Sequence, residues 1–267
     1  MTTHQTKNTF NVVIPARMAS TRFPGKALQE LLGKPMLGHV HDRALASGAA
    51  EIIVAVDDQK LADYCSDSGC NFVMTSPDHV NGTERIAEVV RTLRWSDSTV
   101  VVGLQCDEPA TPPAIIRQVA DNMATHADAD MATLCTRITG KKDYLDPNRV
   151  KVVRDTHNFA MYFSRAPIPW RRDVSGHKEA DDASFADSWL HIGMYAYRAG
   201  FLKRYVSFYE TQPEREEKLE QLRALGYGCR IHVDESIAQP SHGVDLPSDM
   251  AEAERALQAL QNEGKQL

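Results

Sequence analysis

Short apolar runs alternate with amphipathic helical patterns over the first half of the chain. The runs at residues 12–14, 51–56 and 99–104 are rich in Val and Ile, and brief β-branched runs between turn signals indicate buried strands. Repeated strand–helix–strand units require a mostly parallel sheet with right-handed crossovers. The sequence to about residue 127 therefore predicts a doubly wound α/β sheet. Residues 99–104 are the most continuously apolar run, so we expect that strand in the middle of the parallel sheet.

The second half of the chain has a different pattern. Its first expected strands are joined by short connections, which favour antiparallel pairing. The expected strands are 131–138, 150–154, 159–163, a cleanly alternating run at 190–198, and 230–233. Helices are expected at 199–209, 214–226 and 247–260. Residues 174–188 contain few apolar side chains, so we expect a mobile loop there. No repeat or linker divides the sequence, which predicts one domain.

Composition argues against several classes of protein. The 267 residues carry a formal net charge of −6, whereas proteins that coat nucleic acid depend on a dominant positive field. The first ten residues are polar, and no apolar run has the length of a membrane helix. An odd number of cysteines without a C-x-x-C pair argues against a disulfide framework or a zinc knuckle. They are Cys65, Cys70, Cys106, Cys135 and Cys229. We expect a soluble cytoplasmic protein that binds neither nucleic acid nor membrane.

A basic loop follows the first expected strand. Arg17, Arg22 and Lys26 are interleaved with hydroxyl side chains and Gly25. In an open α/β sheet, ligands bind at the carboxyl ends of the strands, and a basic, Gly-containing loop there suits a polyphosphate. The loop matches neither a Walker A motif nor a dinucleotide fingerprint. A solvated basic loop without a ligand is the open alternative.

Two acidic segments are candidates to complete such a site. Asp107 and Glu108 directly follow the run 99–104, so we expect them in the same crevice as the basic loop. A carboxylate beside a polyphosphate suits Mg²⁺, which takes one or two carboxylates together with phosphate oxygens. The alternative is a turn whose acids cap the next helix. Asp245, shortly before Pro247, is by itself an ordinary helix-entry residue.

Other polar residues have no distinctive pattern by themselves. His191 and Tyr195 share one face of an expected strand, as half-buried strands often allow. Glu220 and Gln221 fall on the solvated side of a helical pattern, and Arg165 has the pattern of a surface residue. No Ser–His–Asp arrangement and no metal-type His/Cys spacing stands out in the sequence, so covalent catalysis and zinc chemistry rank low.

Taken together, several segments resemble one known family. In chain order they are VVIPARMASTRFPGK (12–26), TSPDHVNGTER (75–85), GLQCDEP (103–109), PNRVKVV (147–153), MYFSRAPIPW (161–170), HIGMYAYR (191–198), KLEQLRAL (218–225) and GVDLPSDM (243–250). They are similar to the 3-deoxy-manno-octulosonate (Kdo) cytidylyltransferases. The resemblance implies a glycosyltransferase-A-like nucleotidyltransferase fold over 1–267. Its implied parts are a nucleotide-binding half at 11–127, a sugar-binding and dimerisation part at 128–235, and a return segment with a final helix at 236–267.

The resemblance also implies a reaction and a site. CTP and Kdo would give CMP-Kdo and pyrophosphate for lipopolysaccharide synthesis, in a Mg²⁺-dependent homodimer. Arg17 and Lys26 would hold the triphosphate, while Asp107 and Asp245 would bind a Mg²⁺ that bridges Kdo and the α-phosphate. The residues implied around the cytosine and ribose are Asn81, Gly82, Thr83 and Arg85. Those implied around the sugar acid are Gln105, which would border both substrates, Arg165, His191, Tyr195, Glu220 and Gln221.

Two positions depart from the family pattern. Cys106 stands where the family usually has Gly, and Asn81 where it usually has Ser, so a paralogue acting on an amino-Kdo or another ulosonate stays open. Cys106 would bring a thiol to a tight loop, where we expect sensitivity to oxidation or alkylation. The rival functions are a CMP-sialic-acid-type synthetase, a sugar-1-phosphate nucleotidylyltransferase and a catalytically silent nucleotide-binding homologue. His191 with Gly193, together with KLEQLR, favours the Kdo branch.

Overall fold

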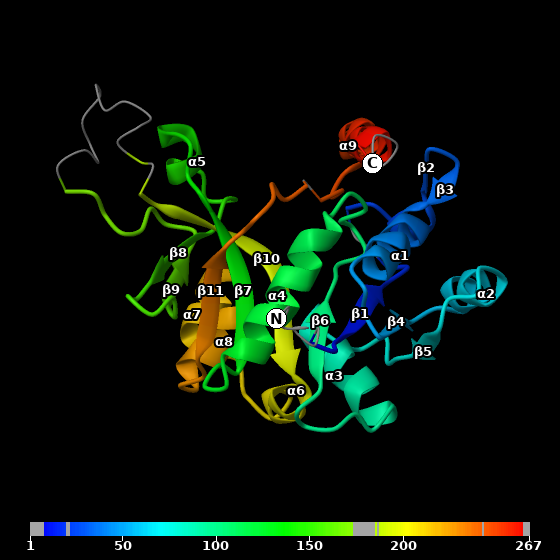
Figure 1. Ribbon diagram of the computed structural model, residues 1–267, viewed down its shortest axis with the longest axis horizontal. Coiled ribbons are helices and arrows are strands. Elements are labelled where there is room, and N and C mark those ends of the chain that lie inside the picture. Colours follow the sequence, from blue (N-terminus) through cyan, green and yellow to red (C-terminus); the bar gives the residue numbers. More distant parts are fainter. Residues whose placement is uncertain (1–7, 20–21, 173–184, 186, 242, 264–267) are drawn as a thin grey trace, which may run out of the picture.

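A computed structural model describes residues 8–19, 22–172, 185, 187–241 and 243–263. A nine-stranded mixed sheet runs through the molecule, and helices cover both of its faces (Figure 1). Strands from both halves of the chain belong to this sheet. The doubly wound α/β architecture predicted from the sequence is confirmed. The expected loop at 174–188 falls largely on residues outside the described ranges.

The first half supplies the parallel part of the sheet, in the order β5-β4-β1-β6. Its strands are β1 (Asn11–Ala16), β4 (Glu51–Val56), β5 (Phe72–Met74) and β6 (Val100–Gly103). The connecting helices are α1 (Met36–Ala46), α2 (Gln59–Asp67), α3 (Gly82–Thr92) and α4 (Pro113–Thr125). Between β1 and α1 lie the short elements η1 (Lys26–Leu28), β2 (Glu30–Leu31) and β3 (Lys34–Pro35). Parallel neighbours place the carboxyl ends of these strands along one edge, which is where the basic loop begins.

The second half adds strands that run in both directions. The long strand β10 (Trp189–Arg198) lies between β6 and β7 (Met131–Arg137) and is antiparallel to both. Strand β11 (Ile231–Glu235) continues the sheet parallel to β7, while β8 (Lys151–Arg154) and β9 (Ala160–Ser164) extend from β10 as an antiparallel pair. The run 99–104 thus forms an interior strand of the sheet, as expected, but β6 is parallel to β1 on one side only and antiparallel to β10 on the other. Strand β6 is apolar because both of its faces are covered, whatever the direction of its neighbours.

Two apolar clusters occupy opposite faces of the sheet. Alternate residues of β1 point to different clusters, with Val12 and Ile14 in one and Val13 in the other. The first cluster includes the apolar residues of α1, α2 and α4. The second includes those of α3, α6 and α8. This alternation is the period of two expected for a strand buried on both sides.

The helices of the second half include one that was not expected, α5 (Lys141–Leu145), and the helices expected at 199–209 and 214–226 are shorter than predicted. The shorter helices are α6 (Ala199–Tyr205), α7 (Gln212–Glu217) and α8 (Gln221–Gly226). The helix expected at 214–226 is broken because Lys218 adopts a left-handed backbone with φ of 53°. The break brings Glu220 to the start of α8. The last expected helix is preceded by the turn η3 (Pro247–Asp249) and forms α9 (Met250–Glu263).

None of the helices in the described part of the chain combines the length and the apolar character needed to cross a bilayer.

Lys151 holds the loop that precedes β8. Its side chain is fully buried, and its ammonium donates to the carbonyl oxygens of Asp146, Arg149 and Arg165 at 2.8, 2.7 and 2.7 Å. An ammonium has three donors, so all of them are used. Burial lowers the pKa of Lys151, yet the three carbonyl partners compensate the buried group.

Replacing Lys151 by Met should lower the free energy of unfolding by about 3 kcal/mol, because three buried carbonyl groups would lose their donor. Denaturant unfolding measures this loss, and Lys60→Met at an exposed position of α2 is the control. Equal stability of both variants would contradict a structural role of the Lys151 ammonium.

Cys106 lies in the loop after β6, but the expectation that its thiol is reactive is wrong. The residue is buried, and burial, with a smaller effect of Asp107, raises the pKa of the thiol. A protonated thiol is a poor nucleophile. The side chain instead fills the apolar cluster beneath α4 and so acts as a small core residue.

We expect Cys106 to stay unmodified by iodoacetamide in the folded protein, with or without saturating CTP, because the thiolate is inaccessible. Peptide mapping after timed labelling checks this, with the same protein in denaturant as the positive control. Labelling of native Cys106 within minutes would contradict it.

Candidate functional site

A cavity of about 580 Å³ lies at the carboxyl end of β6 and along the polar face of β10. The start of α3, the turn between α7 and α8 and the loop after β6 form its other walls. Six of the residues predicted for the site line this cavity. They are Thr83, Gln105, His191, Tyr195, Glu220 and Gln221. The structure thus brings together residues that are separated by more than half of the chain.

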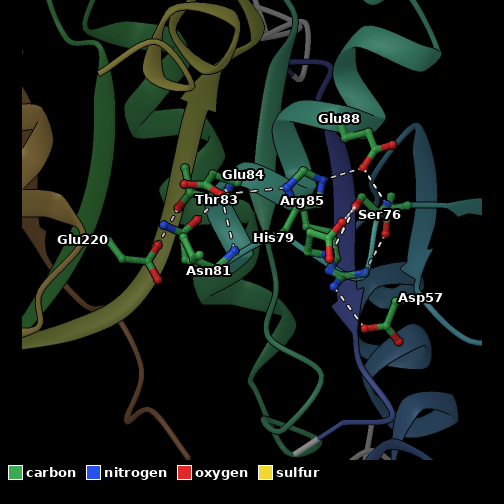
Figure 2. Close-up of polar contacts among 12 residues, drawn as sticks. Asp57, Ser76, His79, Asn81, Thr83, Glu84, Arg85, Glu88 and Glu220 are labelled. Carbon is green, nitrogen blue, oxygen red and sulfur yellow. Dashed lines mark hydrogen bonds and ion pairs between the residues drawn. The ribbon is translucent and has the colours of Figure 1, made fainter. Parts of the chain in front are cut away.

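Residues at the start of α3 make the polar contacts drawn in Figure 2, and Thr83 among them lines the cavity. Asn81 caps the helix by accepting a hydrogen bond from the backbone of Glu84 at 2.8 Å, so the usual capping chemistry is kept where the family has Ser. A Cβ at Gly82 would lie 3.4 Å from the Gln105 side chain, which places the start of α3 next to the loop after β6. Thr83 donates to Glu220 at 2.9 Å. This bond joins the predicted nucleotide segment to the predicted sugar segment.

Arg85 does not face the cavity. Its guanidinium is buried and donates to Thr75 at 2.6 Å and to Asp57 at 3.0 Å. The other carboxylate oxygen of Asp57 accepts from the backbone of Met18 at 3.2 Å. Arg85 therefore connects the start of α3 to the basic loop through Asp57 (Figure 2). Arg85 is not among the residues that line the larger cavity, and the contacts it makes here are within the protein.

A buried ion network holds α8 against α3. Arg223 donates to both carboxylate oxygens of Glu214 at 2.7 to 3.0 Å, and to Glu84 at 3.3 Å. Arg223 and Glu214 are both buried, so the pair is held by several hydrogen bonds rather than by charge alone. Glu84 adjoins Thr83, and Arg223 lies one turn after Glu220. The network therefore reinforces the contact between Thr83 and Glu220.

The part of the cavity formed by β10 and α8 contains unpartnered polar atoms. The hydroxyl of Tyr195 and the amide nitrogen of Gln221 are buried without a hydrogen-bond partner among the described residues. Burial raises the pKa of the Glu220 carboxyl, and the bond from Thr83 partly opposes this shift. Buried donors without partners are costly to a folded protein. Because they border the cavity, these atoms are free to bond a polar molecule within it.

His191 lines the same cavity, with its ring between those of Phe163 and Tyr195 at centroid distances of 4.9 and 5.3 Å. Burial lowers the pKa of the imidazole to about 3. The ring is therefore neutral near pH 7, so it can offer a hydrogen bond but no positive charge to the cavity.

The basic loop and the two acidic segments meet next to the cavity. The Lys26 ammonium donates to Asp107 at 2.7 Å and to the carbonyl oxygen of Val244 at 2.9 Å, and it lies 3.8 Å from Asp245. Arg22 pairs with Asp245 at 2.8 Å. The backbone of Val244 also donates to the carbonyl oxygen of Asp107 at 2.8 Å. The two predicted metal-binding aspartates are thus neighbours on one ammonium group.

Arg17 follows β1 at the start of the basic loop. Its side chain is exposed and makes no ion pair with the described residues. Asp245 also lines a smaller cavity of about 420 Å³, which shares Ser241 and Gly243 with the larger one. The basic loop, the two aspartates and the larger cavity therefore form one continuous region.

Arg165 is not brought to the cavity. Its guanidinium donates to the carbonyl oxygens of Glu217 and Pro147 at 2.7 and 3.0 Å, so the contact seen is with the backbone that precedes the cavity wall. Conversely, sequence reasoning missed several residues that line the cavity or support it. They are Thr133, Asn148, Arg149 and Lys218. Asn148 and Arg149 lie in the segment PNRVKVV (147–153), which contributed to the resemblance. The pattern of that segment by itself assigns no role to either residue.

Comparisons with known proteins agree with this geometry. A family model described as cytidylyltransferase matches residues 11–234. The 3-deoxy-manno-octulosonate cytidylyltransferase of Thioalkalivibrio sulfidiphilus is 50% identical over 94% of this chain and 99% of its own. That of Alkalilimnicola ehrlichii is 51% identical over 93% of this chain and 96% of its own.

Solved structures give the same relationship. A CMP:2-keto-3-deoxy-manno-octonic acid synthetase complexed with CTP is 37% identical, with a TM-score of 0.84 over 95% of this chain and 100% of the other. A 4-diphosphocytidyl-2C-methyl-D-erythritol synthase, at 13% identity and a TM-score of 0.61, shares the fold. The chain belongs to the cytidylyltransferase family and, within it, to the 3-deoxy-manno-octulosonate cytidylyltransferases.

Proposed function

We propose that this protein transfers the cytidylyl group of CTP to the anomeric hydroxyl of Kdo, giving CMP-Kdo and pyrophosphate for lipopolysaccharide synthesis. The observation that carries the proposal is the meeting of Lys26, Asp107 and Asp245 beside a cavity with unsatisfied polar atoms. The charged group of Lys26, Asp107 and Asp245 suits a triphosphate. The cavity with its unsatisfied polar atoms suits a polyhydroxylated acid. Membership of the family gives the reaction class.

The chain's own residues have distinct tasks in this reaction. Lys26 and the exposed Arg17 would neutralise the triphosphate as pyrophosphate leaves. Asn81, Gly82 and Thr83 would border the cytosine and ribose, and Gln105 both substrates. The sugar acid would be held by His191, Tyr195, Glu220 and Gln221, with Arg165 supporting the wall behind them. Because both substrates are anionic, holding them in line against their repulsion is the main contribution of the site.

Asp107 and Asp245 fit a magnesium ion. Both carboxylates lie against one cationic group, Lys26, and Mg²⁺ commonly takes one or two carboxylates. No group of three or more His, Cys, Asp or Glu side chains suited to a metal occurs among the described residues, so phosphate, sugar and water oxygens would complete the coordination. When bound, Mg²⁺ would supply Lewis-acid stabilisation of charge on the phosphate.

Two rival functions differ in the substrate pocket. A CMP-sialic-acid-type or sugar-1-phosphate nucleotidylyltransferase would share the basic loop and the strand-end acid, but about half of all residues are identical to named Kdo enzymes. A catalytically silent homologue is disfavoured because Lys26, Asp107 and Asp245 are all present and adjacent.

A cytoplasmic homodimer completes the proposal. Met161 and Trp170 are each 64% exposed on and after β9, which supports an interface in the part of the chain assigned to dimerisation. Light scattering of the purified protein tests the oligomeric state.

We expect pyrophosphate release with Mg²⁺, CTP and Kdo, and much slower release when UTP or dTTP replaces CTP, because the start of α3 would be specific for cytosine. The same assay with 8-amino-Kdo and N-acetylneuraminate identifies the ulosonate. Failure to release pyrophosphate with any of these acids would contradict the proposed function and favour the silent homologue.

Replacing Asp107 by Asn should reduce turnover at least about 100-fold while CTP affinity changes little, because the carboxylate charge acts on the developing transition state. Chelation of divalent metal with EDTA should abolish turnover of the wild type, and added Mg²⁺ should restore it. Steady-state kinetics and calorimetry with CTP separate the two effects. Asp67→Asn, at an exposed position of α2, is the matched control. Near-normal turnover of Asp107→Asn would reject the assigned role.

A further inference from the structure

Strand β10 contains an irregularity at the point where it borders the larger cavity. Its pairing with β7 shifts register between Ile192 and Tyr195, opposite Thr133. Such a bulge re-aims the side chains on either side of it. Here those side chains are His191 and Tyr195, which both line the cavity.

The Thr133 hydroxyl lies inside this bulge. Thr133 is fully buried, and its oxygen is 2.9 Å from the carbonyl oxygen of Ile192, 2.8 Å from that of Met194 and 3.1 Å from Nε2 of His191. A hydroxyl has one proton to donate and two lone pairs to accept with. Both carbonyl groups can only accept, so the single hydroxyl proton is directed to them.

In the contact between Thr133 and His191, the imidazole must then be the donor and the hydroxyl oxygen the acceptor. If Nε2 lacked a proton, it would compete with two carbonyl oxygens for the one hydroxyl proton, and lone pairs would face each other at hydrogen-bond distance. A proton on Nε2 removes this conflict, because Nε2 donates to a lone pair of Thr133. The imidazole is neutral, since burial lowers its pKa to about 3. Its other nitrogen, Nδ1, therefore carries a lone pair.

Nδ1 is available to a ligand. It has no hydrogen-bond partner among the described residues, and it is not among the atoms buried without a partner. Since the ring lines the larger cavity, the lone pair is open to it. The unpartnered atoms of Tyr195 and Gln221 on the same cavity are donors. An acceptor at His191 gives the wall both kinds of hydrogen-bonding group.

We propose that Thr133 is a positioning residue that keeps the His191 proton on Nε2, so that Nδ1 accepts a hydrogen bond from a hydroxyl group of the sugar acid. The identity of the ligand rests on the proposed function, whereas the tautomer of His191 does not. Because carbonyl groups and the buried hydroxyl fix this choice before any ligand binds, the site is preorganised for a donor.

The tautomer is measured directly by long-range ¹H–¹⁵N NMR of the full-length protein labelled at histidine, with His191 assigned by comparison with His191→Gln. We expect the Nε2–H pattern in the wild type and in Thr133→Ser, which keeps the hydroxyl. Thr133→Val should give a mixture of tautomers. An Nδ1–H or doubly protonated ring in the wild type near pH 7 would overturn the proposal, whether or not Thr133→Val folds.

Kinetics then test the consequence for substrate binding. Thr133→Val should raise KM for Kdo about tenfold, the equivalent of one hydrogen bond, with KM for CTP little changed. Thr133→Ser should recover most of the loss, and Thr156→Val, at an exposed turn, should behave as the wild type. A mono-deoxy analogue lacking the hydroxyl that His191 binds should show equal KM with wild type and Thr133→Val. If Thr133→Val raised KM by the same factor for Kdo and for every mono-deoxy analogue, the proposed contact between His191 and a sugar hydroxyl would be overturned.

These outcomes separate this inference from the proposed function. Absence of turnover by the wild type with any ulosonate contradicts the function and leaves the NMR result to decide the tautomer. Normal turnover together with an unchanged His191 spectrum in folded Thr133→Val contradicts the role of Thr133 alone.

Discussion

The antiparallel pairing of β10 with β6 is the constraint on which the site depends. Tyr195 pairs with Gly103, and Arg198 with Val100, so the earlier part of β10 extends past the carboxyl end of β6. In an open α/β sheet, that end is where ligands bind. The pairing therefore carries His191 and Tyr195 to the place where the loop with Gln105 and Asp107 begins. A parallel strand in this position would have brought a different set of side chains to the crevice.

Two types of interaction then join the start of α3 to the segment that carries Glu220. Thr83 and Glu220 are hydrogen-bonded directly, while Arg223 fixes α8 to α3 through Glu84 and to α7 through Glu214. The buried network is fully hydrogen-bonded, which is the condition under which buried charge is tolerated. The break of the helix at Lys218 allows this arrangement, because a continuous helix would have kept Glu220 on a helical surface rather than at the start of α8.

The charged group at the edge of the sheet depends on contacts between distant segments. Lys26 bonds Asp107 and also the backbone next to Asp245, and the loops after β6 and before η3 are joined by a backbone hydrogen bond. These contacts hold two carboxylates near one cation. Electrostatic stabilisation is most effective when charges are positioned in advance, because little reorganisation is then needed during the reaction.

The sequence by itself determined the strands and helices of the first half, because their periodicity is local and each apolar face must be buried. It also located the loop residues Lys26 and Asp107, since strand ends mark the ligand edge of such a sheet, and the resemblance added Asp245 and the sugar-site residues. Tertiary structure alone decided the rest. Arg85 and Arg165 make contacts within the protein instead of lining the cavity, Cys106 is buried, and the helix at 214–226 is broken. The role of Thr133 also depends on a bulge in β10 that begins at Ile192, 59 residues further along the chain. Each of these outcomes is set by burial and by partners distant in the chain, and local patterns carry no information about such partners.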